Sequence, residues 1–144
     1  PSLVTSAIFS PNSQYILTIG QDNIIRVFTM EGRQLSTLKG HSDEITYTAF
    51  SPGSNYIVSA SLDHTTRVWD IEGNELQILA SHKAGVMKAS FSSDGKYILT
   101  ASLDHTARLT PWRVEDVLHK INVEKVRGEV WELSEEDKTL YGIF

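Results

Sequence analysis

Three residues of this chain, His41, Ser59 and Asp63, are of the types that perform acyl transfer in serine hydrolases. That chemistry requires an exposed serine oxygen beside donors that stabilise an oxyanion, with histidine as the general base. The Gly-x-Ser-x-Gly turn that exposes the nucleophile in one large class of hydrolases is absent from the sequence. We therefore favour a structural role for these residues and keep a hydrolase as an alternative.

Two further histidines, His64 and His105, directly follow the aspartates Asp63 and Asp104. A zinc site would typically need a His-x-x-x-His or His-Glu pair, or cysteines, and the chain has none of these. Tight turns often require a positive φ, which asparagine and histidine tolerate better than most residues. We expect turn positions here, with no metal and no cofactor.

The dominant feature of the sequence is an internal repeat with a constant interval of 41 residues. The hexapeptide at 60–65 recurs residue for residue at 101–106. Duplication, and not chance, produces such a register. Five columns keep it without insertion or deletion: Val4, Ile45 and Val86; Phe9, Phe50 and Phe91; Tyr15, Tyr56 and Tyr97; Asp22, Asp63 and Asp104; Arg26, Arg67 and Arg108.

Each unit consists of short alternating segments separated by turn residues. The units open at 4–9, 45–50 and 86–91, and a turn rich in Pro, Asn, Ser and Gly follows each opening segment. A β-branched segment, the Asp turn and a third segment come next, and Gly32 and Gly73 lead into fourth segments at 34–39 and 75–80. Four strands with hairpin links predict one antiparallel blade per unit.

The second unit begins with Gly40-His41, and its third strand ends with Trp69-Asp70. With these two dipeptides and the regular period, residues 1–112 resemble three WD40 repeats, at about 1–40, 41–81 and 82–112. The resemblance implies an all-β fold with three four-stranded antiparallel propeller blades. Three blades form an incomplete ring, since closed propellers have about four to eight.

The resemblance also implies a structural tetrad in each blade. In WD40 repeats an aspartate accepts from a histidine, whose other nitrogen meets a serine or threonine hydroxyl, and that hydroxyl accepts from a tryptophan indole. The implied members are His41, Ser59, Asp63 and Trp69 in the second unit, Thr18 and Asp22 in the first, and His82, Thr100 and Asp104 in the third.

WD40 propellers favour certain contact positions, which flank the first apolar residue of the opening strand or precede the tetrad aspartate. The resemblance places these positions at Leu3, Thr5 and Gln21, at Glu44, Thr46 and Leu62, and at Gly85, Met87 and Leu103. We call these nine positions the partner rim. Leu62, Met87 and Leu103 would form an exposed apolar cluster there, which is typical of an interface.

The repeated Arg26, Arg67 and Arg108 alternate with apolar neighbours along the third strands. We expect them on the solvated face of the strand, or with their aliphatic stems lying on the adjacent blade.

The period ends after Trp112, and residues 113–144 form a distinct tail. Apolar residues at 114, 117, 118 and 121 predict an amphipathic helix, and Ser134 with the acidic residues after it predicts a second helix start. Residues 122–131 could supply the fourth strand of the third blade or pack across an open edge. The segments 110–113, 133–136 and 141–142 resemble the C-terminal ends of bacterial WD40 proteins, which often carry an effector domain upstream.

The formal net charge of −5 disfavours nucleic acid as the main partner, because phosphate binding needs clustered Lys and Arg. No apolar run is long enough for a membrane span, and no leader pattern opens the chain. The absence of cysteine suits a reducing compartment, so we expect a cytoplasmic protein.

The sequence thus predicts a non-catalytic scaffold or sensor module that binds a protein or peptide, within a larger propeller or signalling protein. Ring closure could come from further blades of a longer chain, from a second copy, or from the tail capping an open arc. Two alternatives stay open: a hydrolase using His41, Ser59 and Asp63, and a self-assembling propeller fragment with no other partner.

Overall fold

The computed structural model describes residues 2–112; residue 1 and residues 113–144 lie outside the described part. The predicted helices and closing strand of the tail therefore lie outside the described residues. Within residues 2–112 the chain forms β-strands joined by turns and contains no helix that could cross a membrane.

Three antiparallel sheets follow one another along the chain, and in each sheet every strand pairs with the next strand in sequence. Blade 1 contains β1 (Val4–Phe9), β2 (Tyr15–Gly20), β3 (Ile24–Thr29) and β4 (Gln34–Lys39). Blade 2 contains β5 (Ile45–Phe50), β6 (Tyr56–Ser61), β7 (Thr66–Asp70) and β8 (Glu75–Leu79). Blade 3 contains β9 (Val86–Phe91), β10 (Tyr97–Ser102) and β11 (Ala107–Pro111).

The same local chemistry closes the first turn of every blade. A serine hydroxyl at the end of the first strand accepts a hydrogen bond from the N–H of the tyrosine that begins the second strand. This bond fixes the hairpin register, which decides which face each side chain takes. The pairs are Ser10 with Tyr15 at 2.9 Å, Ser51 with Tyr56 at 3.1 Å, and Ser92 with Tyr97 at 3.0 Å.

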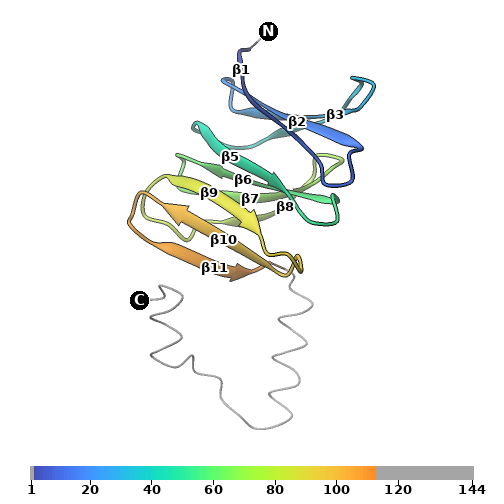
Figure 1. The fold of residues 1–144 in the computed structure, drawn as a ribbon. Helices are drawn as coiled ribbons and strands as arrows, with labels where there is room; N and C mark the ends of the chain where they lie inside the picture. The colour runs from blue at the N-terminus through green and yellow to red at the C-terminus, as the bar shows by residue number, and fades with distance from the viewer. Residues whose placement is uncertain (1, 113–144) are drawn as a thin grey trace.

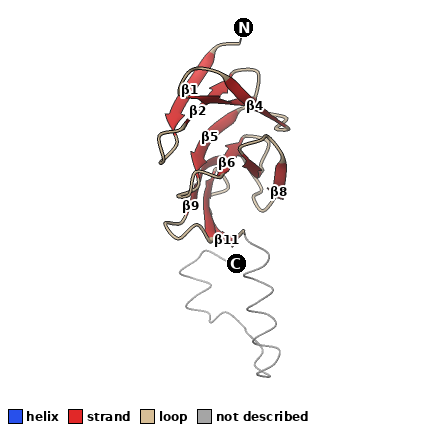
Figure 2. Ribbon diagram, turned by 90° about the vertical axis from the view of Figure 1, so that its right-hand side faces the viewer, coloured by secondary structure: helices blue, strands red, loops and turns tan. Residues whose placement is uncertain are grey.

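The sheets stack face to face as an arc, with blade 2 in the middle (Figure 1). Figure 2 shows β1, β5 and β9 along one side of the stack and β4 and β8 along the other. One apolar core lies between blades 1 and 2, and a second lies between blades 2 and 3. Successive residues of β6 serve the two cores, Ile57 the first and Val58 the second, so this strand is buried on both faces.

The predicted all-β propeller architecture is confirmed by these stacked sheets. Blades 1 and 2 each have the four predicted strands, and the described part of blade 3 has three. The segment proposed for its fourth strand, 122–131, lies outside the described residues.

Candidate functional site

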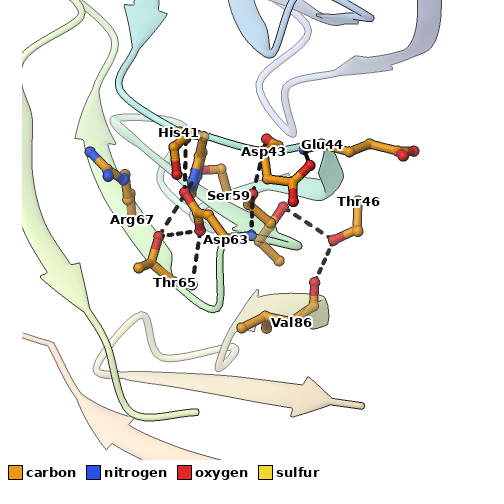
Figure 3. Close-up of polar contacts among 12 residues, drawn as sticks. His41, Asp43, Glu44, Thr46, Ser59, Asp63, Thr65, Arg67 and Val86 are labelled. Atoms are coloured by element: carbon orange, nitrogen blue, oxygen red, sulfur yellow. Dashed lines mark hydrogen bonds and ion pairs between the residues drawn. The ribbon is translucent and has the colours of Figure 1, made fainter. Parts of the chain in front are cut away.

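Blade 2 contains a continuous hydrogen-bond chain that runs through four side chains. His41 precedes β5, Ser59 lies in β6, Asp63 lies in the β6–β7 turn and Trp69 lies in β7. The Asp63 carboxylate lies 2.8 Å from His41 Nδ1, and His41 Nε2 lies 2.7 Å from Ser59 Oγ (Figure 3). Trp69 Nε1–H donates to the same Ser59 oxygen at 2.9 Å.

These contacts assign the direction of every bond. Asp63 is an acceptor only, so His41 carries its proton on Nδ1, and Nε2 accepts from the Ser59 hydroxyl. The Ser59 oxygen then accepts from the Trp69 indole. Burial lowers the pKa of the His41 imidazole below its ordinary value, and Asp63 offsets this only in part. The ring is therefore neutral near pH 7, in agreement with this assignment.

The order of donors equals that of a hydrolytic triad, but the position of the serine differs. Ser59 is fully buried, and its oxygen lies between His41 and Trp69. A nucleophilic serine needs an open approach for the substrate carbonyl and donors beside it. The network instead provides hydrogen bonds for the four polar side chains and anchors the loop before β5 to the sheet.

Asp63 is held by more bonds than the sequence pattern indicated. Its carboxylate also accepts from the Thr65 hydroxyl at 2.6 Å, the Thr65 N–H at 2.9 Å and the Ser42 N–H at 3.1 Å. Burial raises the pKa of Asp63, but the bonds from Thr65 and His41 outweigh it and lower that pKa to about 2. The repeated Asp-His-Thr sequence was the available signal for the threonine.

Blade 3 repeats the network without the tryptophan. His82 Nδ1 lies 2.9 Å from the Asp104 carboxylate, and His82 Nε2 lies 2.7 Å from Thr100 Oγ1. Thr106 donates to Asp104 at 2.6 Å, as Thr65 does to Asp63. This Thr106 bond, against the opposing effect of burial and together with the Lys83 N–H and His82, lowers the pKa of Asp104.

In blade 1 the tetrad aspartate has another partner. Asp22 forms an ion pair with Arg26 at 2.6 Å, and Thr18 is half-buried in β2. In blade 2, where His41 occupies the aspartate, the equivalent Arg67 pairs with Glu75 of β8 instead. The Arg67 side chain is only 16% exposed, so the expectation of a solvated arginine is wrong for this blade. The two arginines of the same column therefore pair with different carboxylates, Arg26 with Asp22 and Arg67 with Glu75.

His64 and His105 occupy the strained turn position that the sequence predicts, with φ of 71° and 67°. Asn23, their equivalent in blade 1, has a φ of 58°. Over residues 2–112, no group of three or more His, Asp or Glu side chains could hold a metal ion.

The partner rim is built from backbone pairs. In each blade the residue before the tetrad aspartate donates its N–H to the carbonyl of the residue before the opening strand, at 2.9 Å. This bond joins the first and third rim positions of a blade, which are far apart in sequence. The pairs are Gln21 with Leu3, Leu62 with Glu44, and Leu103 with Gly85.

The second rim position of each blade is a strand bulge. The pairing of the opening strand with its neighbour skips one residue, which is Thr5 in β1, Thr46 in β5 and Met87 in β9. A bulge turns the side chain of its extra residue away from the regular alternation. Thr46 uses this to donate to the Val86 carbonyl of blade 3 at 2.6 Å (Figure 3), which binds blades 2 and 3 together.

An apolar cluster lies on the rim where blades 2 and 3 meet. A side chain on Gly85 would meet Leu62 Cδ2 at 2.7 Å and Leu103 Cδ1 at 3.6 Å, so the two leucines flank this glycine. Leu103 is 56% exposed and Met87 41%, whereas Leu62 is half-buried. Leu3 is also exposed, on blade 1.

The chain is similar to one known family. The model of the WD domain, G-beta repeat, matches residues 1–29, 32–70 and 73–110, and no curated protein matches significantly. The matched segments cover most of the chain and contain the three tetrad aspartates and the inner strands of all three blades. On this evidence and on its stacked antiparallel blades, the chain belongs to the WD40 repeat family.

Proposed function

We propose that this chain is a non-catalytic scaffold or sensor module that holds a protein or peptide partner on its rim. WD40 repeats indicate a protein-interaction propeller. The observation that carries the proposal is the pair of leucines, Leu62 and Leu103, that flanks Gly85 on the rim, with the exposed Met87 two residues further along the chain. Exposed apolar side chains that are grouped and fixed by backbone bonds supply the buried centre of an interface.

The proposal that the module is not a hydrolase rests on Ser59. Its hydroxyl is fully buried and engaged by His41 and Trp69, so an acyl substrate has no approach to it. A fluorophosphonate probe should leave Ser59 unlabelled in the native protein. Labelling of Ser59 in the folded chain would contradict the proposal.

The rim can be tested with a site-specific photo-crosslinker, because the chain contains no cysteine. Lys83 is exposed next to the rim, so a benzophenone attached to a Lys83→Cys variant should capture the partner from cell extract. The purified partner is then titrated against Leu62→Asp/Leu103→Asp and against the control Leu76→Asp, whose leucine is 47% exposed on β8. The double variant should bind at least about tenfold more weakly, a loss of about 1.4 kcal/mol. Equal affinities for the double variant and the native chain would refute the proposed rim.

A further inference from the structure

Blade 1 exposes an apolar face that the corresponding blades bury. Its members, here called the blade 1 end face, are Val4, Phe9, Ile16 and Phe28, which lie opposite the face that packs on blade 2. Val4 is 56% exposed, whereas its equivalents Ile45 and Val86 are 5% and 0% exposed. Phe9 is 67% exposed, whereas its equivalent Phe50 is 9% exposed.

Blade 3 exposes the opposite face of the repeat. Its members, here called the blade 3 end face, are Leu99, Ala101 and Leu109. Leu99 is 49% exposed, but its equivalents Leu17 and Val58 are fully buried against the following blade. Each junction between neighbouring blades joins these two kinds of face. The arc exposes one of them on blade 1 and the other on blade 3.

The two end faces match the junction that the chain already contains between blades 2 and 3. On the blade 2 side of that junction lie Val58, Ala60 and Val68, and the blade 3 end face presents Leu, Ala and Leu in the same columns. On the other side lie Val86, Phe91 and Ile98, and the blade 1 end face presents the identical Val, Phe and Ile in those columns. Docking of the two end faces would therefore repeat a contact already present in the chain.

We infer that the blade 1 end face takes the blade 3 end face of a second copy of this chain, in a head-to-tail junction. Within one copy the two faces lie at opposite ends of the arc (Figure 1) and cannot meet. Two copies joined at both ends form a ring of six blades, which lies within the range of about four to eight found in closed propellers. The columns of Leu62 and Gly85 are those of Leu103 and Leu3 in the proposed junction, so the junction adjoins the partner rim. Phe9 and Leu99, which test the junction below, are not rim positions.

The first test is the mass of the full chain in solution over a range of concentrations. The mass should rise from the monomer value of 16.1 kDa towards twice that value. Phe9→Glu and Leu99→Glu should each return the chain to a monomer, and because both side chains are already exposed the blades should still fold. The control Leu76→Glu, also exposed but on the outer strand β8, should leave the dimer intact.

The second test fixes the polarity of the junction, again because the chain has no cysteine of its own. A mixture of Val4→Cys and Leu99→Cys chains should form disulfide-linked dimers that contain one chain of each kind. Each variant alone should form none. A monomer at every concentration, a dimer that survives both glutamate variants, or disulfides between two Val4→Cys chains would overturn the inference.

Discussion

The tetrad position that holds a serine or threonine is Thr18 in blade 1, Ser59 in blade 2 and Thr100 in blade 3. The three hydroxyls differ in how many buried side chains they form hydrogen bonds with. Ser59 serves two side chains, His41 and Trp69, whereas Thr100 serves one side chain, His82, and makes a long contact of 3.4 Å to the Arg108 carbonyl. In blade 1 the equivalent Thr18 faces the open end of the arc, where no indole occupies the tryptophan column. Removal of the hydroxyl should therefore destabilise the chain most in Ser59→Ala, less in Thr100→Val and least in Thr18→Val.

The magnitudes follow from the groups that lose a partner. A buried polar group without a hydrogen bond costs about 1–3 kcal/mol. Ser59→Ala leaves two such groups, the His41 Nε2 atom and the Trp69 N–H, so we expect a loss of about 2–6 kcal/mol in the free energy of unfolding. Thr100→Val leaves one, for a loss of about 1–3 kcal/mol, and Thr18→Val should cost less than about 1 kcal/mol.

Urea unfolding followed by far-ultraviolet circular dichroism measures this series. The urea concentration at the midpoint should be lowest for Ser59→Ala, intermediate for Thr100→Val and highest for Thr18→Val. The slope of the free energy against urea should stay the same, because only stability changes. Changes in stability are then comparable across the three variants, provided that unfolding stays two-state. Equal losses at the three positions, or a larger loss at Thr18 than at Ser59, would refute the view that the network stabilises the blades through its buried partners.

Two further predictions concern the same turns. The pKa of Asp63 is lowered from 3.8 to about 2 and the pKa of His41 is lowered from 6.5, so the unfolded chain binds more protons in acid. The urea midpoint should therefore fall as the pH drops below 6.5 and fall further below 3.8. Asp63→Asn should reduce the second decrease and leave the part due to Asp104, whose pKa is also lowered, whereas an unchanged profile in that variant would contradict the assignment. His64 has a φ of 71°, a conformation that a β-branched side chain disfavours and glycine tolerates. Thermal unfolding should show that His64→Val lowers the free energy of unfolding by about 1–2 kcal/mol and that His64→Gly changes it by less than about 1 kcal/mol. Equal effects of the two substitutions would exclude backbone strain as the cause.

Much of this fold can be predicted from the sequence because its information is local and repeated. The serine that closes the first turn, the residue of positive φ after the aspartate, and the alternation along each strand all act within a few positions. The 41-residue register then places every column of one blade over the same column of the next. The assignment of His41, Ser59, Asp63 and Trp69 to one network came instead from the resemblance to WD40 repeats.

What could not be predicted depends on contacts between distant residues and on single-residue shifts. Arg67 pairs with Glu75 but Arg26 pairs with Asp22, although the two arginines occupy the same column, and the blade 1 equivalent of Glu75 is Gln34. The bulges at Thr46 and Met87 leave no mark in the repeat, because the columns stay in register on the sequence while the pairing of the strands shifts by one residue. Neither effect has a signature in hydrophobic periodicity.

The offset between sequence repeat and sheet explains why the tetrad is placed where it is. The matched segment 32–70 contains β4 of blade 1 together with β5, β6 and β7 of blade 2, and the segment 73–110 contains β8 of blade 2 together with β9, β10 and nearly all of β11 of blade 3, so these two repeats each connect two sheets. His41 lies on the connection between them, and its bonds to Asp63 and Ser59 fix that connection to blade 2. The same connection carries Glu44, whose carbonyl accepts from the Leu62 N–H on the rim. A buried network that fixes the link between sheets therefore also fixes the surface on which we propose that a partner binds.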